Sequence, residues 1–309
     1  MIQKKTNRNY DLIVITGPTA TGKTKLAAEL AWHLDGEIIS ADSRQVYKDM
    51  DMGSGKDMAD YVIQGQIIPA HLVDIVKPGY EFNVFEFQKE FVKAFSHIRK
   101  RDKQAIMCGG TGLYLEAALA GYKMVEVPED PVLRKQLEKL AHPELEEKLK
   151  SLKPLHNTTD TSSRERLIRA IEIETHQQNA EPDPESYPSF NHIIFGVNFP
   201  RQTIRERITR RLKLRLENGM VEEVQQLLKS GIKPEQLTFY GLEYKYITLY
   251  VIGEITYKEL FSKLNTAIHQ FAKRQMTWFR RMEKNGFTIH WIDGELDNEK
   301  KIERIKEHL

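Results

Sequence analysis

The chain has 309 residues, of which 40% are hydrophobic, and a formal net charge of +2. This length is sufficient for one large α/β domain with an appendage, and the composition excludes a disordered or fibrous protein. Because the total charge is nearly neutral, any surface that binds nucleic acid must come from local clusters of basic residues.

Apolar runs alternate with helical patterns along most of the chain, which predicts a parallel sheet covered by helices on both faces. The predicted strands are residues 12–16, 37–41, 70–76, 104–108 and 192–199, and the predicted helices include 23–34 and 84–99. We therefore expect an α/β fold with a P-loop NTPase-like core, a parallel sheet and a helical insertion domain.

The domain organisation follows from a change of character after the fourth predicted strand. Residues 125–191 carry prolines, charges and helical patterns without a convincing strand, and the sheet-like pattern then resumes. We predict a first part of the core at 1–124, a helical insertion domain at 125–191, and a second, mainly helical part of the core at 192–309.

Cysteine usage and the apolar runs bear on the compartment. Cys108 is the single cysteine and lies in an apolar run, which excludes an intramolecular disulfide and predicts a buried thiol in a reducing compartment. The N-terminus has no hydrophobic signal region, and no run approaches the ~18 apolar residues that span a membrane. We expect a soluble, cytoplasmic monomer with no membrane partner.

The segment GPTATGKT, residues 17–24, lies between a predicted strand and a predicted helix. It matches the phosphate-binding pattern G-x-x-x-x-G-K-T in full and in the required context. Gly17 and Gly22 let the backbone amides curve around an anion, Lys23 neutralises charge, and the Thr24 hydroxyl can bind Mg²⁺. The pattern indicates a diphosphate or triphosphate site without specifying a nucleotide.

Two further polar residues follow predicted strands, where ligands of open α/β sheets bind. Asp42 comes after the second strand and Thr111 lies in CGGTGLY, after the fourth. Each also has an ordinary structural explanation, because Asp often caps a helix or turn and Thr can cap a glycine turn. A hydrolase would need a magnesium-binding Asp, often followed by Glu; Asp74, followed by Ile75, matches this poorly. We interpret GSGK, residues 53–56, as a turn.

Basic residues cluster in three places. Residues 201–215 contain seven bases and one acid, and Arg207 and Arg211 share a helix face. Residues 272–281 interleave bases, Arg274 among them, with aromatics, and a third cluster lies at 164–169. A solvated helix explains most such runs, but unbalanced bases mixed with aromatics suit an RNA backbone and its bases.

Together, GPTATGKT, ADSRQVYKDMDMGSGK, CGGTGLY, RERLIRAIEI and AKRQMTWFR resemble the tRNA dimethylallyltransferase (tRNA isopentenyltransferase) family in its bacterial form. The resemblance runs from Gly17 to about Asp293, and the motifs are in the family's order. It implies transfer of a dimethylallyl group from dimethylallyl diphosphate to N6 of the adenine immediately 3′ of a tRNA anticodon. It also implies Mg²⁺ as cofactor and the tRNA anticodon stem-loop as partner.

The resemblance assigns roles to individual residues. Asp42 and Thr111 would be catalytic, Asp42 accepting the amine proton and Thr111 lying near the bridging oxygen of the diphosphate. The diphosphate would be held by Gly17, Thr19, Ala20, Thr21, Gly22, Lys23, Thr24, Arg207 and Arg211, with Thr24 on Mg²⁺. The residues that would touch tRNA are Ser43, Arg44, Gln45, Arg134, Glu165, Arg166, Arg169, Tyr244, Lys245 and Arg274.

The chain departs from the commoner bacterial pattern at one point and leaves alternatives open. Where that pattern has Gly, Tyr and a basic residue in succession, this chain has Gly-Leu-Glu-Tyr-Lys at 241–245. The alternatives are an adenylate isopentenyltransferase acting on free adenine nucleotides, a P-loop small-molecule kinase, and an RNA-binding protein without enzymatic activity.

Overall fold

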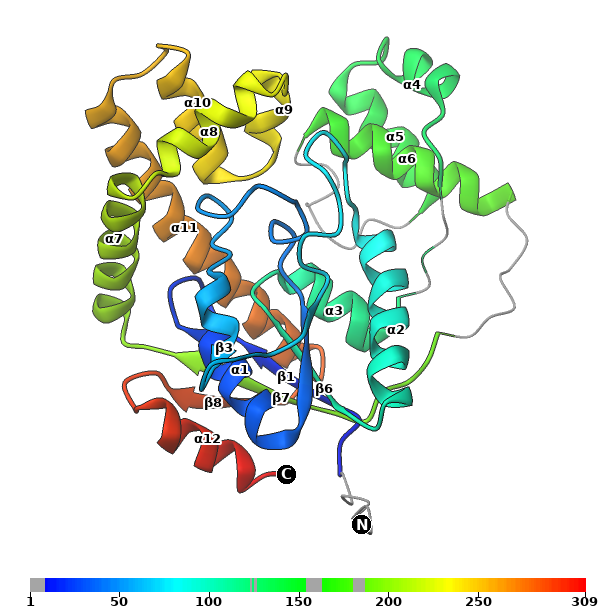
Figure 1. Cartoon of the computed structure of the whole chain (residues 1–309). Helices are drawn as coiled ribbons and strands as arrows, with labels where there is room; N and C mark the ends of the chain where they lie inside the picture. Colours follow the sequence, from blue (N-terminus) through cyan, green and yellow to red (C-terminus); the bar gives the residue numbers. More distant parts are fainter. Residues whose placement is uncertain (1–8, 123, 125–126, 154–162, 180–186) are drawn as a thin grey trace. The chain divides into compact units, whose positions relative to one another are not determined.

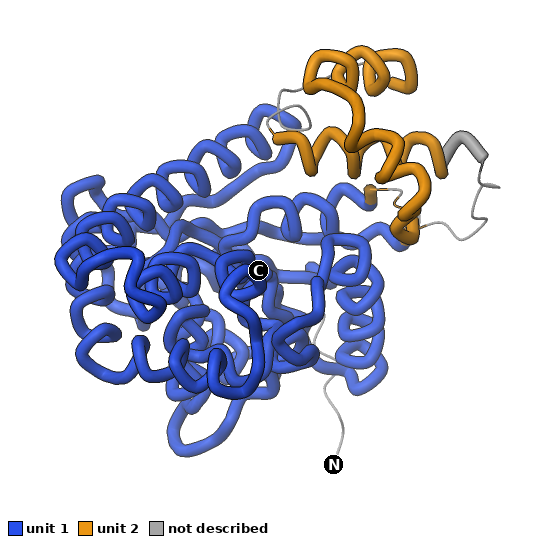
Figure 2. The backbone as a smooth tube through the Cα atoms, turned by 90° about the horizontal axis from the view of Figure 1, so that it is seen from above, with its two compact units in different colours: residues 1–121, 188–309 blue, residues 122–187 orange. Residues whose placement is uncertain are grey.

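The computed structural model describes residues 9–122, 124, 127–153, 163–179 and 187–309. The chain divides into two compact units, one of Met1–Gly121 with Pro188–Leu309 and the other of Tyr122–Tyr187 (Figure 2). The second unit begins and ends slightly earlier than the insertion that we predicted at 125–191.

Six parallel strands form the sheet of the larger unit, in the order β5-β2-β6-β1-β7-β8; Figure 1 labels β1, β6, β7 and β8 among them. Their bounds are β1 Leu12–Thr16, β2 Gly36–Ser40, β5 Ala70–His71, β6 Gln104–Gly109, β7 His192–Asn198 and β8 Ile289–Asp293. Because all strands run the same way, the carboxyl ends of β1, β2 and β6 lie at one edge, where the predicted ligand loops begin. The predicted α/β class with a parallel sheet is confirmed.

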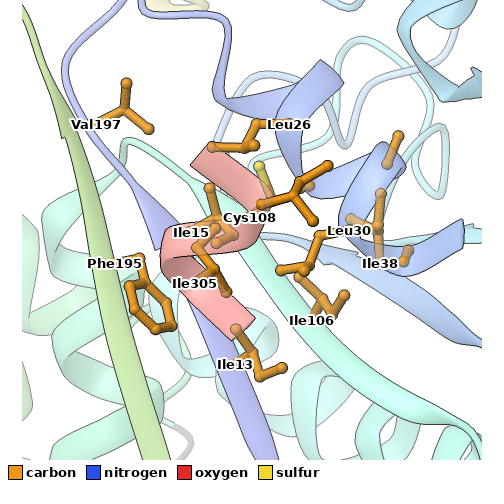
Figure 3. Packing of buried hydrophobic residues seen from close by; sticks show 14 of the residues in the cluster. Ile13, Ile15, Leu26, Leu30, Ile38, Ile106, Cys108, Phe195, Val197 and Ile305 are labelled. Atoms are coloured by element: carbon orange, nitrogen blue, oxygen red, sulfur yellow. The ribbon is translucent and has the colours of Figure 1, made fainter. Parts of the chain in front are cut away.

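Alternate residues of each strand pack on opposite faces of this sheet. Ile13 and Ile15 of β1 belong to a buried cluster with α1 (Lys23–Leu34) and α12 (Asn298–Lys306), shown in Figure 3. The helix α2 (Val84–Lys100) contacts β2 and β6 but contributes nothing to that cluster, so it covers the opposite face with α3 (Gly112–Ala120). Each buried Ile or Leu side chain stabilises the fold by roughly 1.5–3 kcal/mol.

The predicted strand at 70–76 is wrong beyond β5. Leu72 and Asp74 have positive φ angles of 60° and 55°, which a strand does not adopt. The chain turns there, and the Asp74 carboxylate pairs with the buried ammonium of Lys56. Between β2 and β5 the chain also forms a short 3₁₀ helix, η1 (Met58–Tyr61), and a small hairpin of β3 (Val62–Ile63) and β4 (Gln66–Ile67). The other predicted strands agree with the structure to within one residue at either end.

After β7 the larger unit is mainly helical, as predicted. The helices are α7 Arg201–Glu217, α8 Met220–Lys229, α9 Pro234–Phe239, α10 Leu242–Val251 and α11 Tyr257–Lys284. They share a second buried cluster, to which Val46, Tyr47 and Met50 contribute from the loop after β2. This cluster fixes that loop against the helices that carry the basic residues.

The smaller unit contains α4 (Pro131–Leu137), α5 (His142–Leu152) and α6 (Arg164–Asn179). Leucines and isoleucines of the three helices form its own hydrophobic core, including Leu145, Leu167 and Ile171. In the described part of the chain, no helix has the length and apolar character needed to cross a membrane.

Candidate active site

The loop at 17–24 connects β1 to α1 and ends in an uncapped helix N-terminus. Gly22 is the N-cap residue, with φ 79°, and no side chain caps the helix. The N–H groups of the first turn are therefore available to an anion, which the helix dipole also favours. Burial lowers the pKa of Lys23, partly offset by attraction to Cys108 and Asp42. A bound diphosphate would compensate this partly buried ammonium.

Two arginines of α7, which share one face of the helix as their spacing predicted, lie against the loop. Arg207 donates a hydrogen bond of 2.8 Å from Nε to the carbonyl of Ala20. Arg211 lines a small cavity with Thr19, Ala20 and Glu243, and burial lowers its pKa to about 10. Among the described residues Arg211 has no hydrogen-bond or ion-pair partner. A partly buried guanidinium without a partner is unfavourable, which favours an anionic ligand here.

Asp42 and Thr111 are brought together by the ends of two neighbouring strands. β2 and β6 approach so closely that a Cβ on Gly109 would lie 2.2 Å from the carbonyl oxygen of Ala41. Beyond this contact, Ser43 donates a backbone hydrogen bond of 3.1 Å to Oγ1 of Thr111. Thr111 is the N-cap residue of α3, yet its side chain does not cap that helix. Its hydroxyl oxygen instead joins the loop after β6 to the loop after β2.

The Asp42 carboxylate is only partly used by the fold. Oδ1 accepts a hydrogen bond of 2.9 Å from the backbone N–H of Arg44, which is the turn interaction expected of an Asp at this place. Oδ2 has no hydrogen-bond partner among the described residues. One carboxylate oxygen thus remains to accept a proton.

Lys56 holds together the segment between β2 and β5. It is 3% exposed, forms ion pairs with Asp51 and Asp74, and donates to the carbonyl of Tyr47 at 3.0 Å. GSGK is thus a turn, as predicted, and its lysine has a structural role. Asp74, the nearest candidate for the carboxylate of a hydrolase, is neutralised by this lysine.

The donor set for a metal ion at this site is small. Among the described residues there is no group of three or more His, Cys, Asp or Glu side chains able to hold a metal ion. Mg²⁺ in phosphate sites takes most of its ligands from water and substrate and one or two from protein. The partly exposed Thr24 hydroxyl in the first turn of α1 fits such a site.

Comparison with known proteins identifies the family. The family described as IPP transferase matches residues 45–282, and the family described as Isopentenyl transferase matches residues 10–67. The chain belongs to the IPP transferase family. It is 55% identical to tRNA dimethylallyltransferase 2 of Bacteroides fragilis over 97% of this chain and 98% of that protein. It is 54% identical to tRNA dimethylallyltransferase 1 of Geotalea uraniireducens over 96% of each.

Solved structures agree with this membership. The full-length tRNA isopentenylpyrophosphate transferase from Bacillus halodurans is 32% identical, with a TM-score of 0.70 over 96% of this chain and 94% of that one. A eukaryotic dimethylallyltransferase described as acting on tRNA, at 23% identity and a TM-score of 0.74, shares the fold over 92% of this chain and 73% of that one.

In this IPP transferase, several residues expected to touch tRNA lie at the surface of the larger unit. Lys245 and Arg274 are exposed, and Ser43 and Arg44 are partly exposed in the loop that also carries Asp42. The Arg44 guanidinium lies over the Phe239 ring, 5.8 Å from its centroid. These assignments stay predictions.

Two of the assignments to tRNA need correction. Tyr244 is fully buried, and its hydroxyl donates a hydrogen bond of 2.7 Å to Glu223. Gln45 is 7% exposed and accepts a hydrogen bond from Ser40. Neither side chain is accessible to RNA. The Gly-Leu-Glu-Tyr-Lys departure from the family pattern therefore places a core residue where we expected a contact residue.

In the smaller unit, two of the expected tRNA contacts are committed to a buried carboxylate. Glu172, whose side chain is 1% exposed, accepts hydrogen bonds from Arg134, from Arg169 and from the backbone of Asp130. Burial alone would raise the pKa of Glu172, but these hydrogen bonds outweigh it and the pKa is lowered. Glu165 and Arg166 are exposed on α6, and the role of all four in tRNA binding stays a prediction.

Sequence reasoning missed two polar residues that organise the site. Glu223 accepts hydrogen bonds from the backbone of Asp51, Met52 and Gly53, as well as from Tyr244. Gln275, the residue after Arg274, is buried between the loops that carry Thr19 and Thr111. A signal for Gln275 was present, because it shares the buried face of α11 with Ile268, Ala272, Phe279 and Met282.

Proposed function

We propose that this protein transfers a dimethylallyl group from dimethylallyl diphosphate to N6 of the adenine immediately 3′ of a tRNA anticodon. In this reaction the bond between N6 and the allylic carbon forms while the bond from that carbon to the diphosphate oxygen breaks. Diphosphate leaves, and the amine proton passes to Asp42. The names of the relatives support tRNA as the acceptor and dimethylallyl as the group transferred.

The observation that carries the proposal is a proton acceptor beside a diphosphate site. Asp42, whose Oδ2 is free, directly precedes Ser43, whose N–H binds Thr111, while Lys23 and the unpaired Arg211 supply positive charge at the loop. Allyl transfer builds negative charge on the leaving diphosphate, so cations and uncapped N–H groups fixed there stabilise the transition state. The engagement of Asp74 with Lys56 is consistent with a reaction that activates no water.

The remaining residues would bind and orient the substrates. The loop residues 17–24 and Arg207 would hold the diphosphate with Arg211, and the Thr111 hydroxyl would donate to its bridging oxygen. Mg²⁺, with Thr24 as its protein ligand, would supply further charge neutralisation on the diphosphate. Ser43, Arg44, Lys245 and Arg274 in the larger unit and exposed Arg166 in the smaller one would contact the anticodon stem-loop, with the protein acting as a monomer.

Label transfer tests the proposal. Protein, Mg²⁺ and radiolabelled dimethylallyl diphosphate are incubated with an unmodified anticodon stem-loop that has adenine 3′ of the anticodon, and with AMP as competitor. We expect label on the stem-loop alone, and none when EDTA replaces Mg²⁺ or when that adenine is replaced by guanine. Label on AMP would assign the protein to free nucleotides. No label on either acceptor would overturn the proposal, and transfer of γ-phosphate from ATP would indicate a kinase.

A further inference from the structure

Gln275 joins the two loops of the candidate active site through one amide group. Its Oε1 accepts a hydrogen bond of 2.9 Å from the backbone N–H of Thr19, in the loop at 17–24. Its Nε2 donates a hydrogen bond of 2.8 Å to the carbonyl of Gly110, next to Thr111. The two loops follow β1 and β6, which are neighbours in the sheet. The Gln275 side chain, which α11 carries, therefore bridges the two loops.

The orientation of this amide follows from its partners. A backbone N–H can only donate and a carbonyl can only accept, so the oxygen must face Thr19 and the nitrogen must face Gly110. The fit is close, because a Cβ on Gly110 would lie 2.5 Å from Nε2 of Gln275. Only glycine at position 110 leaves room for the bridge.

Packing alone does not require a glutamine here. Its neighbours on the buried face of α11 include Ala272 and Phe279, and burying an amide among apolar residues is unfavourable unless it is hydrogen-bonded. A leucine or methionine would fill similar volume without that penalty. Both hydrogen bonds go to backbone atoms of ligand loops, so what the glutamine adds is a fixed distance between these loops.

We propose that Gln275 is a positioning residue that sets the diphosphate loop against the Thr111 loop, so that Thr111 meets the bridging oxygen of the bound diphosphate. The inference rests on the proposed function. Gln275 itself contacts no reacting atom. It acts through Thr19 and Gly110, and a misplacement at either loop would weaken diphosphate binding and slow transfer together.

Gln275→Glu gives a test that a purely structural role would not satisfy. A protonated carboxylic acid has one donor and one acceptor, so it reproduces the bridge, whereas a carboxylate repels the Gly110 carbonyl and the incoming diphosphate. Because burial at this position raises the pKa of the introduced carboxyl group, the variant should be impaired at pH 8 and recover as the pH falls toward 6. The charged group next to the bridge is Lys23, whose Nζ would lie 3.4 Å from a Cβ on Gly110; Lys23 in turn interacts with Cys108, Asp42 and Arg211, and Arg274 precedes Gln275 on α11. All of these groups are also present in the wild type, so the effect of the substitution is the difference between the pH profiles of the variant and the wild type.

The matched control is Gln270→Glu, the same change at an exposed position of the same helix. We expect kcat/KM for dimethylallyl diphosphate in Gln275→Glu to fall roughly ten- to a hundredfold at pH 8, as for loss of a buried hydrogen bond. At pH 6 most of that loss should disappear. Gln275→Met, which can make neither bond, should be impaired equally at both pH values, while Gln270→Glu should follow the wild type.

Binding of inorganic diphosphate, measured by calorimetry with each variant, separates this inference from the proposed function. Weaker binding by Gln275→Glu at pH 8, restored at pH 6, supports the bridge even if the wild type modifies no stem-loop. The inference is overturned if Gln275→Glu tracks Gln270→Glu in binding and in kcat/KM at both pH values. It is also overturned if the loss is independent of pH and matched by a lower melting temperature, because that would be a folding defect alone.

Discussion

The backbone N–H of Ser43 donates a hydrogen bond of 3.1 Å to Oγ1 of Thr111. This bond ties the loop after β2 to the loop after β6 and so holds Asp42, the residue before Ser43, beside Thr111. The Thr111 oxygen is the acceptor in this bond, and its own hydroxyl proton makes only a long hydrogen bond of 3.5 Å to Oγ of Ser43, which it can exchange for a leaving oxygen. The proposed proton acceptor and the proposed leaving-group donor are thereby held in neighbouring loops before substrate binds.

Asp42→Asn should lower turnover by roughly two or more powers of ten, because the variant lacks a proton acceptor. The amide oxygen can still accept from the backbone of Arg44, so the loop should keep its form. Single-turnover transfer to the stem-loop measures the effect, and filter binding of tRNA should give nearly the wild-type affinity. Turnover within a few-fold of the wild type would exclude this role.

Arg211→Ala should raise KM for dimethylallyl diphosphate roughly ten- to a hundredfold, the effect of removing a charged donor from a buried anion. Arg210→Ala is the matched control, because Arg210 is the neighbouring arginine on α7 and is exposed. Steady-state kinetics at constant tRNA concentration give both values. Equal effects of the two substitutions would mean that Arg211 does not contact the diphosphate.

Tyr244→Phe should lower the free energy of unfolding by about 1–2 kcal/mol, because the buried hydroxyl no longer hydrogen-bonds to Glu223. The affinity for tRNA should not change, since Tyr244 is fully buried. Urea unfolding and filter binding measure the two quantities. Weaker tRNA binding with unchanged stability would mean that Tyr244 contacts tRNA after all.

Glu172→Gln should remove a dependence of the smaller unit's stability on pH. The pKa of Glu172 is lowered in the folded state, so its carboxylate stabilises the unit at pH values above the ordinary pKa of 4.5. This stabilisation is lost as the pH falls through the lowered pKa. Hydrogen exchange of α6 amides between pH 3 and pH 7 reports this stability. Glu147→Gln, at an exposed position of α5, is the control and should keep the wild-type profile.

Arg166→Ala should weaken tRNA binding and reduce the salt slope of log K by about one, as expected for one lost phosphate contact. Arg169 is a poorer probe, because its guanidinium pairs with Glu172 and its removal would also disturb the fold of the unit. The affinity for dimethylallyl diphosphate should remain at the wild-type value. An unchanged salt slope would mean that Arg166 faces no phosphate.

The parts of the fold that sequence predicted are those with strong local signals. The loop at 17–24 has a defined spacing, and buried parallel strands such as 12–16 are continuous apolar runs. The strand at 70–76 failed because its course depends on Lys56, which reaches Asp74 from a distant part of the chain. No local pattern records such a contact.

The same limit applies to the site. Asp42 and Thr111 were found because both follow strands, but the motif around 241–245 was interpreted by position, and the burial of Tyr244 depends on Glu223. Gln275 was not singled out, because the basic cluster drew the prediction to the adjacent Arg274. The role of a buried amide can be recognised only when its hydrogen-bond partners are known.

The state of Cys108 has a practical consequence. Burial raises the pKa of this thiol to about 12, so almost none of it is the thiolate that reacts with maleimide dyes at neutral pH. Fluorophores can therefore be attached to cysteines introduced at exposed positions 132 and 270, one on each unit, without first removing the native cysteine. Energy transfer between the two dyes would then follow the distance between the units as tRNA and diphosphate bind.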